Sequence, residues 1–231
     1  MTAIPTLKSL GNRVLRECAV PEVSSFNPGN AQSNIAFDAL QDGYQDIWFR
    51  NRWEWQRYQA SIALQVGVAE YPLPANFHRM AVSPWFGPTR TASSMRELTP
   101  EEFYTAIADT DPSIFGQPVY FTINHTTMHL WPTPSDTMVD VAPQLTFQYW
   151  MAPPERKTVS QESHLLPYIP GEFTEMLVLY AKSKLKQHLE FPDFERDMQL
   201  FEKKLATMMN RDRQVRRAPR MRTEFQGVRE W

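Results

Sequence analysis

Apolar residues in the last third of the chain recur every three or four positions, which is the spacing of one face of an α-helix. This pattern predicts one helix from about Gly171 and a second helix after Pro192. The second carries an a/d seam about two heptads long. Because the connection is short, we expect an antiparallel helical hairpin. The residues predicted to form the core of the bundle are Leu177, Tyr180, Phe194, Met198, Phe201 and Leu205.

Two further helices are predicted near the N-terminus. Leu7, Leu10 and Val14 share one helical face, and Thr6 stands before them as a candidate N-cap. A longer helix is predicted over residues 30–50, where apolar residues again recur at helical spacing. Each helix has an apolar face that must be covered, so we expect these two to pack with the C-terminal hairpin in one bundle.

Between the helices the apolar period changes to 2, which is the alternation of β-strands. The predicted strands cover residues 58–66, 78–86 and 145–151, with a hairpin over 118–131. Pro84 predicts that the second strand lies at a sheet edge, because proline cannot donate a ladder hydrogen bond. Thr99, followed by Pro100 and two glutamates, predicts the start of a short helix.

The expected fold class is therefore α+β. A helical bundle is formed by the N- and C-terminal helices, with a β-rich insert between them and an extended C-terminal tail. The predicted boundaries are 1–56 for the N-terminal helices, 57–165 for the insert, 166–210 for the helical hairpin and 211–231 for the tail.

Composition excludes several classes of protein. The chain of 231 residues is 42% hydrophobic and 22% charged, which is typical of a soluble globular protein. Cys18 is the single cysteine, so no intrachain disulfide can form. No apolar run approaches the roughly 20 residues that span a bilayer, and no signal-peptide core is recognisable, so we expect no membrane association.

The sequence carries no recognised catalytic motif, neither a phosphate-binding glycine loop nor a nucleophile elbow. His125 and His129 are four residues apart, but they fall on a predicted hairpin rather than on a helix. Cys18 at the end of an apolar-faced helix is more typical of a packed side chain than of a nucleophile. Asp136 and Asp140 are expected in a surface loop. We therefore predict no enzyme activity, no catalytic residue, no cofactor and no metal.

An aromatic cluster at the end of the second helix has two interpretations. Its rings are Trp48, Phe49, Trp53, Trp55 and Tyr58, interleaved with Arg50, Arg52 and Arg57. Such interleaving can stack the bases of single-stranded nucleic acid. The favoured interpretation is that the rings pack in the core and the arginine stems cover them.

The C-terminal segment carries the strongest functional signal. Seven arginines against three acidic residues give residues 211–231 a net charge of +4, which leaves −6 for the rest of a chain whose net charge is −2. Arginines with spaced aromatics are typical of a docking arm that orders on a partner, although a frayed terminus is the alternative. The predicted docking residues are Arg211, Arg213, Arg216, Arg217, Arg220, Arg222, Phe225, Arg229 and Trp231.

Several short segments occur in a fixed order along most of the chain. They are 7–10 (LKSL), 48–55 (WFRNRWEW), 70–77 (EYPLPANF), 98–103 (LTPEEF), 116–121 (GQPVYF), 130–134 (LWPTP) and 169–173 (IPGEF). In order and spacing they resemble the head-to-tail adaptor, or connector, proteins of tailed bacteriophages, especially the short-tailed type. None of these segments carries chemistry, so the resemblance depends on their arrangement.

The resemblance implies a structural virion protein without a catalytic site. Such adaptors form a homo-oligomeric ring, commonly of twelve subunits, in the neck between head and tail. They bind the portal protein, often through the C-terminal segment, and the tail nozzle protein is assembled below them. Genomic DNA passes through the lumen without sequence-specific binding. Assembly in the host cytoplasm is expected.

Three other functions stay open at this stage. The chain could be a tail-tube or nozzle component with a similar outline. It could be a nucleic-acid-binding module that uses the Arg-rich tail and the aromatic cluster. It could also be a hydrolase whose motif is not recognised.

Overall fold

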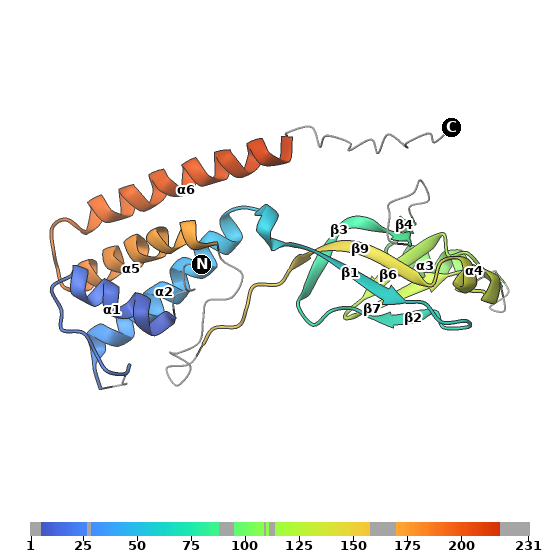
Figure 1. Cartoon of the computed structure of the whole chain (residues 1–231), viewed down its shortest axis with the longest axis horizontal. Coiled ribbons are helices and arrows are strands. Elements are labelled where there is room, and N and C mark those ends of the chain that lie inside the picture. The colour runs from blue at the N-terminus through green and yellow to red at the C-terminus, as the bar shows by residue number, and fades with distance from the viewer. Residues whose placement is uncertain are drawn as a thin grey trace, which may run out of the picture. The chain divides into compact units, whose positions relative to one another are not determined.

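The computed structural model describes residues 6–26, 29–87, 95–108, 110, 114–157 and 170–217. The chain divides into two compact units. We call residues 1–54 with 155–231 the helical unit, and residues 55–154 the β-rich unit. The predicted α+β class is confirmed, since one unit is built from helices and the other mainly from strands (Figure 1).

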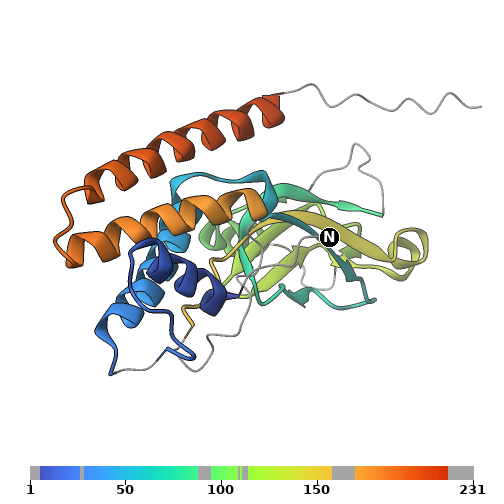
Figure 2. The ribbon, with the colours of Figure 1, turned by 60° about the vertical axis from the view of Figure 1, so that its left-hand side comes forward.

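The helical unit joins helices from the two ends of the chain. Its elements are α1 (Leu7–Glu17), α2 (Ala31–Arg50), the 3-10 turn η3 (Gly171–Phe173), α5 (Thr174–His188) and α6 (Phe194–Arg217). The first helix packs on α2 and α5, α2 packs on α5, and α5 packs on α6. Figures 1 and 2 show α5 between α6 and the N-terminal helices. The core of this unit is therefore shared by segments about 150 residues apart in the sequence.

Side-chain caps fix where the N-terminal helices begin. The Thr6 hydroxyl accepts a hydrogen bond from the Ser9 amide at 3.1 Å, so the predicted cap is confirmed. The Asn30 side-chain oxygen accepts from the Ser33 amide at 3.1 Å in the same way at the start of α2. Each cap satisfies one amide that the first helical turn leaves without a partner.

Two helix glycines allow close packing that a methyl group would block. A Cβ at Gly11 would lie 2.2 Å from the Phe26 ring, and a Cβ at Gly43 would lie 2.8 Å from Cδ1 of Tyr180 on α5. Gly11 lowers the helix propensity of α1, and the close packing of Phe26 on α1 explains its presence. Gly43 has the corresponding role between α2 and α5.

We expect Gly43→Ala to lower the free energy of unfolding by about 1–3 kcal/mol, because overpacking against Tyr180 outweighs the gain in helix propensity. Denaturant titration measures the change. In a Tyr180→Ala background the same substitution should cost clearly less, since the ring atoms at 2.8 and 3.0 Å are gone and only the Cβ of residue 180, at 3.2 Å, stays close. Equal losses in both backgrounds would contradict the packing account.

Over its described residues, the β-rich unit contains three small sheets and two helices. Its strands are β1 (Arg57–Ala63), β2 (Glu70–Pro72), β3 (Phe77–Phe86), β4 (Arg96–Glu97), β5 (Phe115–Gly116), β6 (Tyr120–Asn124), β7 (Thr127–Trp131), β8 (Thr133–Pro134) and β9 (Gln144–Met151), and its helices are α3 (Pro100–Ala108) and α4 (Asp136–Val141). The 3-10 turn η1 (Glu54–Gln56) precedes β1. The sheet orders are β1-β9-β3, β2-β7-β6-β4 and β5-β8.

The antiparallel sheet β1-β9-β3 follows from the alternation in the sequence. The central strand β9 pairs Phe147 with Ala60 and Leu145 with Ile62 of β1, and both β9 residues are fully buried. The strand that contains Pro84 lies at the sheet edge, so that prediction is confirmed. The predicted hairpin is also confirmed, as β6 and β7.

Two short helices lie between the strands. Before α3, Thr99 and Glu102 form a capping box, in which the Thr99 hydroxyl accepts from the Glu102 amide and the Glu102 carboxylate accepts from the Thr99 amide. The expectation of a loop at Asp136 and Asp140 is wrong, because both lie on α4. Ser135 caps this helix through the Met138 amide. No residue of α4 is buried, so the segment lacks the apolar face that would have predicted a helix.

Candidate docking surface of the helical unit

The residues predicted as the bundle core lie on α5 and α6. Three of them are buried (Leu177, Phe201 and Leu205), and three are half-buried (Tyr180, Phe194 and Met198). The Phe201 ring meets the Tyr180 ring edge-on, with centroids 5.2 Å apart. The buried residues of α6 form a narrow seam, so most of its surface stays open to solvent.

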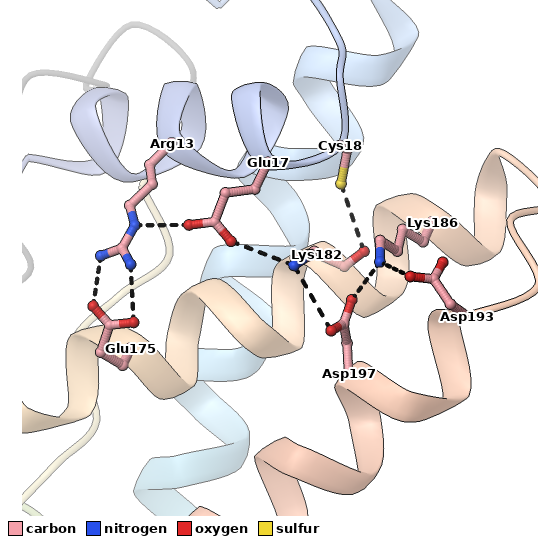
Figure 3. A network of polar contacts seen from close by, with 8 residues as sticks. All are labelled: Arg13, Glu17, Cys18, Glu175, Lys182, Lys186, Asp193 and Asp197. Carbon is pink, nitrogen blue, oxygen red and sulfur yellow. Dashed lines mark hydrogen bonds and ion pairs between the residues drawn. The ribbon is translucent and has the colours of Figure 1, made fainter.

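Ion pairs run from α1 through α5 to α6 (Figure 3). Lys186 on α5 pairs with Asp193 and lies 2.9 Å from the Asp197 carboxylate on α6. Lys182, one turn earlier, lies 3.8 Å from Asp197 and 3.5 Å from Glu17 on α1. The side chains of Lys186 and Asp197 are only 9% and 8% exposed. Burial lowers the pKa of Lys186, but the two carboxylates outweigh burial and raise it overall.

A second part of this network fixes α1 on α5. The Arg13 guanidinium donates two hydrogen bonds to Glu175, at 2.7 and 2.9 Å, and a third to Glu17 at 3.0 Å. The hydrogen bonds from Arg13 lower the pKa of Glu175. The planar fork of arginine suits this bidentate contact, so the pair orients the two helices as well as attracting them.

The groups considered for chemistry have ordinary structural environments. Cys18 is buried, and its burial raises the pKa of the thiol to about 11, so the reactive thiolate is scarce at neutral pH. His125 lies in the turn between β6 and β7, and His129 lies 3.5 Å from Glu70. Within the described residues, no group of three or more His, Cys, Asp or Glu is placed to hold a metal ion. Over the same residues, no helix has the length and apolar character to cross a bilayer.

The segment predicted as a tail begins inside a helix. The last helix continues past Asn210 to Arg217, so the first seven residues of the predicted tail, 211–217, are helical. Arg and Gln favour helix, and the first proline after α6 is Pro219. Arg211 is exposed and pairs with Glu172 at 2.9 Å, and Arg213 is exposed. Arg216 and Arg217 end the helix, while the predicted docking residues Arg220, Arg222, Phe225, Arg229 and Trp231 lie outside the described residues.

Asp212 ties the last turns of α6 to the end of α2. Its carboxylate accepts a hydrogen bond from the Asn51 side-chain amide and another from the Glu54 backbone amide, both at 3.0 Å. The contacts join positions about 160 residues apart in the sequence, so no local pattern could have identified them. Together with Arg211, Asp212 makes the end of α6 part of the helical unit.

We expect Asp212→Ala to lower the free energy of unfolding by about 1–2 kcal/mol, because two charge-assisted hydrogen bonds are lost at a partly buried position. Asp212→Asn keeps an acceptor for the Glu54 amide and should cost less. Arg213→Ala, at the exposed neighbouring position, serves as the matched control and should be near neutral. If all three substitutions had the same effect in denaturant titration, the anchoring role of Asp212 would be excluded.

The aromatic cluster is partly a core element. Trp48 and Trp53 are 5% and 1% exposed, and the Trp53 indole N–H donates to the Ile47 carbonyl at 2.6 Å. The Trp53 ring also meets Phe173 edge-on, with centroids 4.9 Å apart. Packing in the core is therefore confirmed for these two tryptophans, whereas Phe49 is 67% exposed at the end of α2.

Comparison with known proteins identifies a family for this chain. The model of the family described as SU10 adaptor protein matches residues 5–224 of this chain. The match covers both the helical unit and the β-rich unit. No curated protein matches the chain significantly.

Proposed function

The chain belongs to the SU10 adaptor protein family, and on that premise we propose that it forms the ring that joins the portal vertex of a phage head to the tail. The family consists of structural phage proteins, and its members are placed in the neck of the virion. In this proposal the copies enclose the channel through which genomic DNA leaves the head. The tail nozzle protein binds the opposite side of the ring.

The observation that carries the proposal is the extent of the family match. It begins at residue 5 and ends at residue 224, so it includes the N-terminal helices and the β-rich unit. It also includes most of residues 211–231, which we call the Arg-rich segment. A nucleic-acid-binding module that used only the aromatic cluster and the Arg-rich segment would not require the rest of this range.

Charge distribution supports the same proposal. The 210 residues before the Arg-rich segment carry a net charge of −6. A body with this charge has little general affinity for nucleic acid, which suits a channel through which DNA must slide. The Arg-rich segment, by contrast, suits an acidic surface on the portal protein.

The helical continuation of α6 changes where the docking arm is expected to start. Arg211 already has a partner within the chain in Glu172, and Asp212 is bound to Asn51 and Glu54. We therefore assign portal docking chiefly to the residues after Arg217, with the aromatic residues Phe225 and Trp231 as anchors. Several arms acting together on one portal ring would make a weak single contact long-lived.

The test is a mass measurement of the full-length protein, alone and with portal rings from the same phage. We expect a closed ring of defined subunit number, formed alone or on the portal. A tube of variable length that assembles without the portal would favour a tail-tube component. A monomer that binds DNA with strong salt dependence and ignores the portal would favour the nucleic-acid-binding module.

A further inference from the structure

The seam that attaches α6 to α5 leaves two flanks of the helix exposed, and these flanks differ in charge. Each residue of an α-helix is rotated by about 100° from the one before it, so the exposed residues beside the seam fall into two groups on opposite sides of it. One flank, which we call the acidic flank, carries Glu195 and Glu202. The other, the basic flank, carries Arg196, Lys203 and Lys204. All five side chains are exposed.

An exposed apolar residue lies at the centre of the basic flank. Leu200 is 40% exposed and stands four residues after Arg196, three before Lys203 and four before Lys204. At these spacings the three cations surround it on the helix surface. Within the part of the chain that the structure describes, Arg196 and Lys203 form no ion pair, and Lys204 has only a longer-range attraction to Glu175 of α5. The basic flank thus presents one apolar side chain framed by three exposed positive charges.

The acidic flank borders an open groove between α5 and α6, with a volume of about 530 Å³. The groove is lined by, among others, Lys184, Gln187, Phe194, Glu195, Met198 and Glu202. The half-buried Phe194 and Met198 give the groove an apolar floor. The lysine that lines the groove, Lys184, makes a cation–π contact: its ammonium lies over the Tyr180 ring, 5.6 Å from the centroid.

Carboxylates of α2 extend the negative surface beyond the groove. Two arginines are shared among four carboxylates here: Arg50 by Asp46 and Glu202, and Arg156 by Asp38 and Asp42. The three aspartates are spaced at i, i+4 and i+8, so they follow one face of α2. Because cations are outnumbered, this side of the helical unit keeps a net negative charge.

We propose that the groove of one copy receives Leu200 of a second copy, with Arg196, Lys203 and Lys204 of that copy facing the carboxylates that border the groove. The inference rests on the proposed function, in which copies of the chain form a ring. The two surfaces lie on opposite flanks of one helix, so the contact is heterologous. Repeated heterologous contacts close into a ring when the rotation between neighbours allows it.

The occupant is a second copy because both complementary surfaces belong to the same chain. An apolar residue framed by cations matches an apolar groove framed by carboxylates in both apolar character and charge. A segment of another virion protein in the same groove is the competing occupant, and cross-linking separates the two cases.

Cysteine cross-linking of the full-length protein, alone and on portal rings, tests this contact. A chain with both Leu200→Cys and Gln187→Cys should give a ladder of disulfide-linked oligomers, because each copy then links to two neighbours. Either substitution alone should give no ladder. The buried Cys18 is present in every variant and serves as the background.

Three outcomes would count against the contact. If the wild-type protein forms rings and the double variant gives no ladder, the groove belongs to another occupant, and the proposed function stands. If Leu200→Cys alone gives dimers, the contact is isologous and the inference is wrong. If the wild-type protein forms no oligomer alone or on the portal, the proposed function fails and the inference fails with it.

Charge reversal provides an independent measurement. Lys203→Glu should raise the protein concentration needed for half-maximal assembly by roughly tenfold, because it places a carboxylate against the acidic flank of the neighbour. Adding Glu195→Lys to the same chain should restore assembly. Both positions are exposed, so circular dichroism of each variant should be unchanged. Equal assembly of Lys203→Glu and wild type would overturn the assignment.

Discussion

Phe201→Ala is expected to lower the free energy of unfolding by about 3–5 kcal/mol. Phe201 has no exposed surface, and its ring packs edge-on against Tyr180 of α5. Removing the ring deletes buried apolar area and leaves a cavity at the centre of the seam that holds α6. Urea titration followed by circular dichroism measures the change.

The neighbouring residue supplies a matched control for this prediction. Leu200→Ala changes the same helix at a position that is 40% exposed, so in the unassembled subunit its effect on unfolding should be within about 0.5 kcal/mol. If Phe201→Ala cost less than about 1 kcal/mol, α6 would not be fixed to α5 through this seam.

Lys186→Met is expected to lower the free energy of unfolding by about 3 kcal/mol, because it leaves the buried Asp197 carboxylate without its nearest cation. Lys182 lies 3.8 Å from Asp197 and reduces the loss of stability, but it does not replace the 2.9 Å contact of Lys186. Denaturant titration measures the effect.

The double variant separates the ion pair from packing. With Lys186→Met and Asp197→Leu together, no buried charge is left unpaired, so much of the lost stability should return. Asp193→Ala, at a side chain that is 54% exposed, should cost little. Additive losses in the double variant would contradict the account of a coupled buried pair.

Local signals explain most of the helices and strands that the sequence predicted. Thr6 precedes α1 in the sequence, and its hydroxyl caps that helix. Thr99 and Glu102 likewise carry both halves of a capping box. Pro84 placed β3 at a sheet edge because it lacks an amide donor. Each of these effects depends on residues at most three or four positions apart, so it can be recognised in the sequence alone.

Contacts between distant segments account for what the sequence did not predict. The apolar pattern stops at Met209, yet α6 continues to Arg217. Arg211 binds Glu172 of η3, and Asp212 binds Asn51, just after α2, and Glu54 of η1. The pairing of Lys186 with Asp197 depends on the geometry of the hairpin and has no motif of its own. Helix α4 buries nothing, so periodicity could not distinguish it from a loop.

The order of short segments was the most informative part of the sequence for function. Its resemblance to phage head-to-tail adaptors is confirmed by the family match over residues 5–224. The short-tailed type stays a prediction. The docking role of the Arg-rich segment is also a prediction, and it is the part of the account on which attachment to the portal depends.

Portal binding by a chain that ends at Arg217 tests the central claim most directly. This end point keeps α6 complete and keeps the contacts of Arg211 and Asp212, which a chain ending at Asn210 would lose along with stability. A second variant, with Phe225→Ala and Trp231→Ala, keeps every arginine and separates aromatic anchoring from charge.

Sedimentation with purified portal rings should show the full-length protein bound in a fixed ratio. The chain ending at Arg217 should be folded and unbound, and the aromatic variant should be weakened by at least tenfold, as expected for the loss of two anchor residues. If the shortened chain bound the portal as tightly as the full-length protein and lost affinity for DNA instead, the adaptor assignment of this segment would be contradicted, and the nucleic-acid-binding module would be the better account.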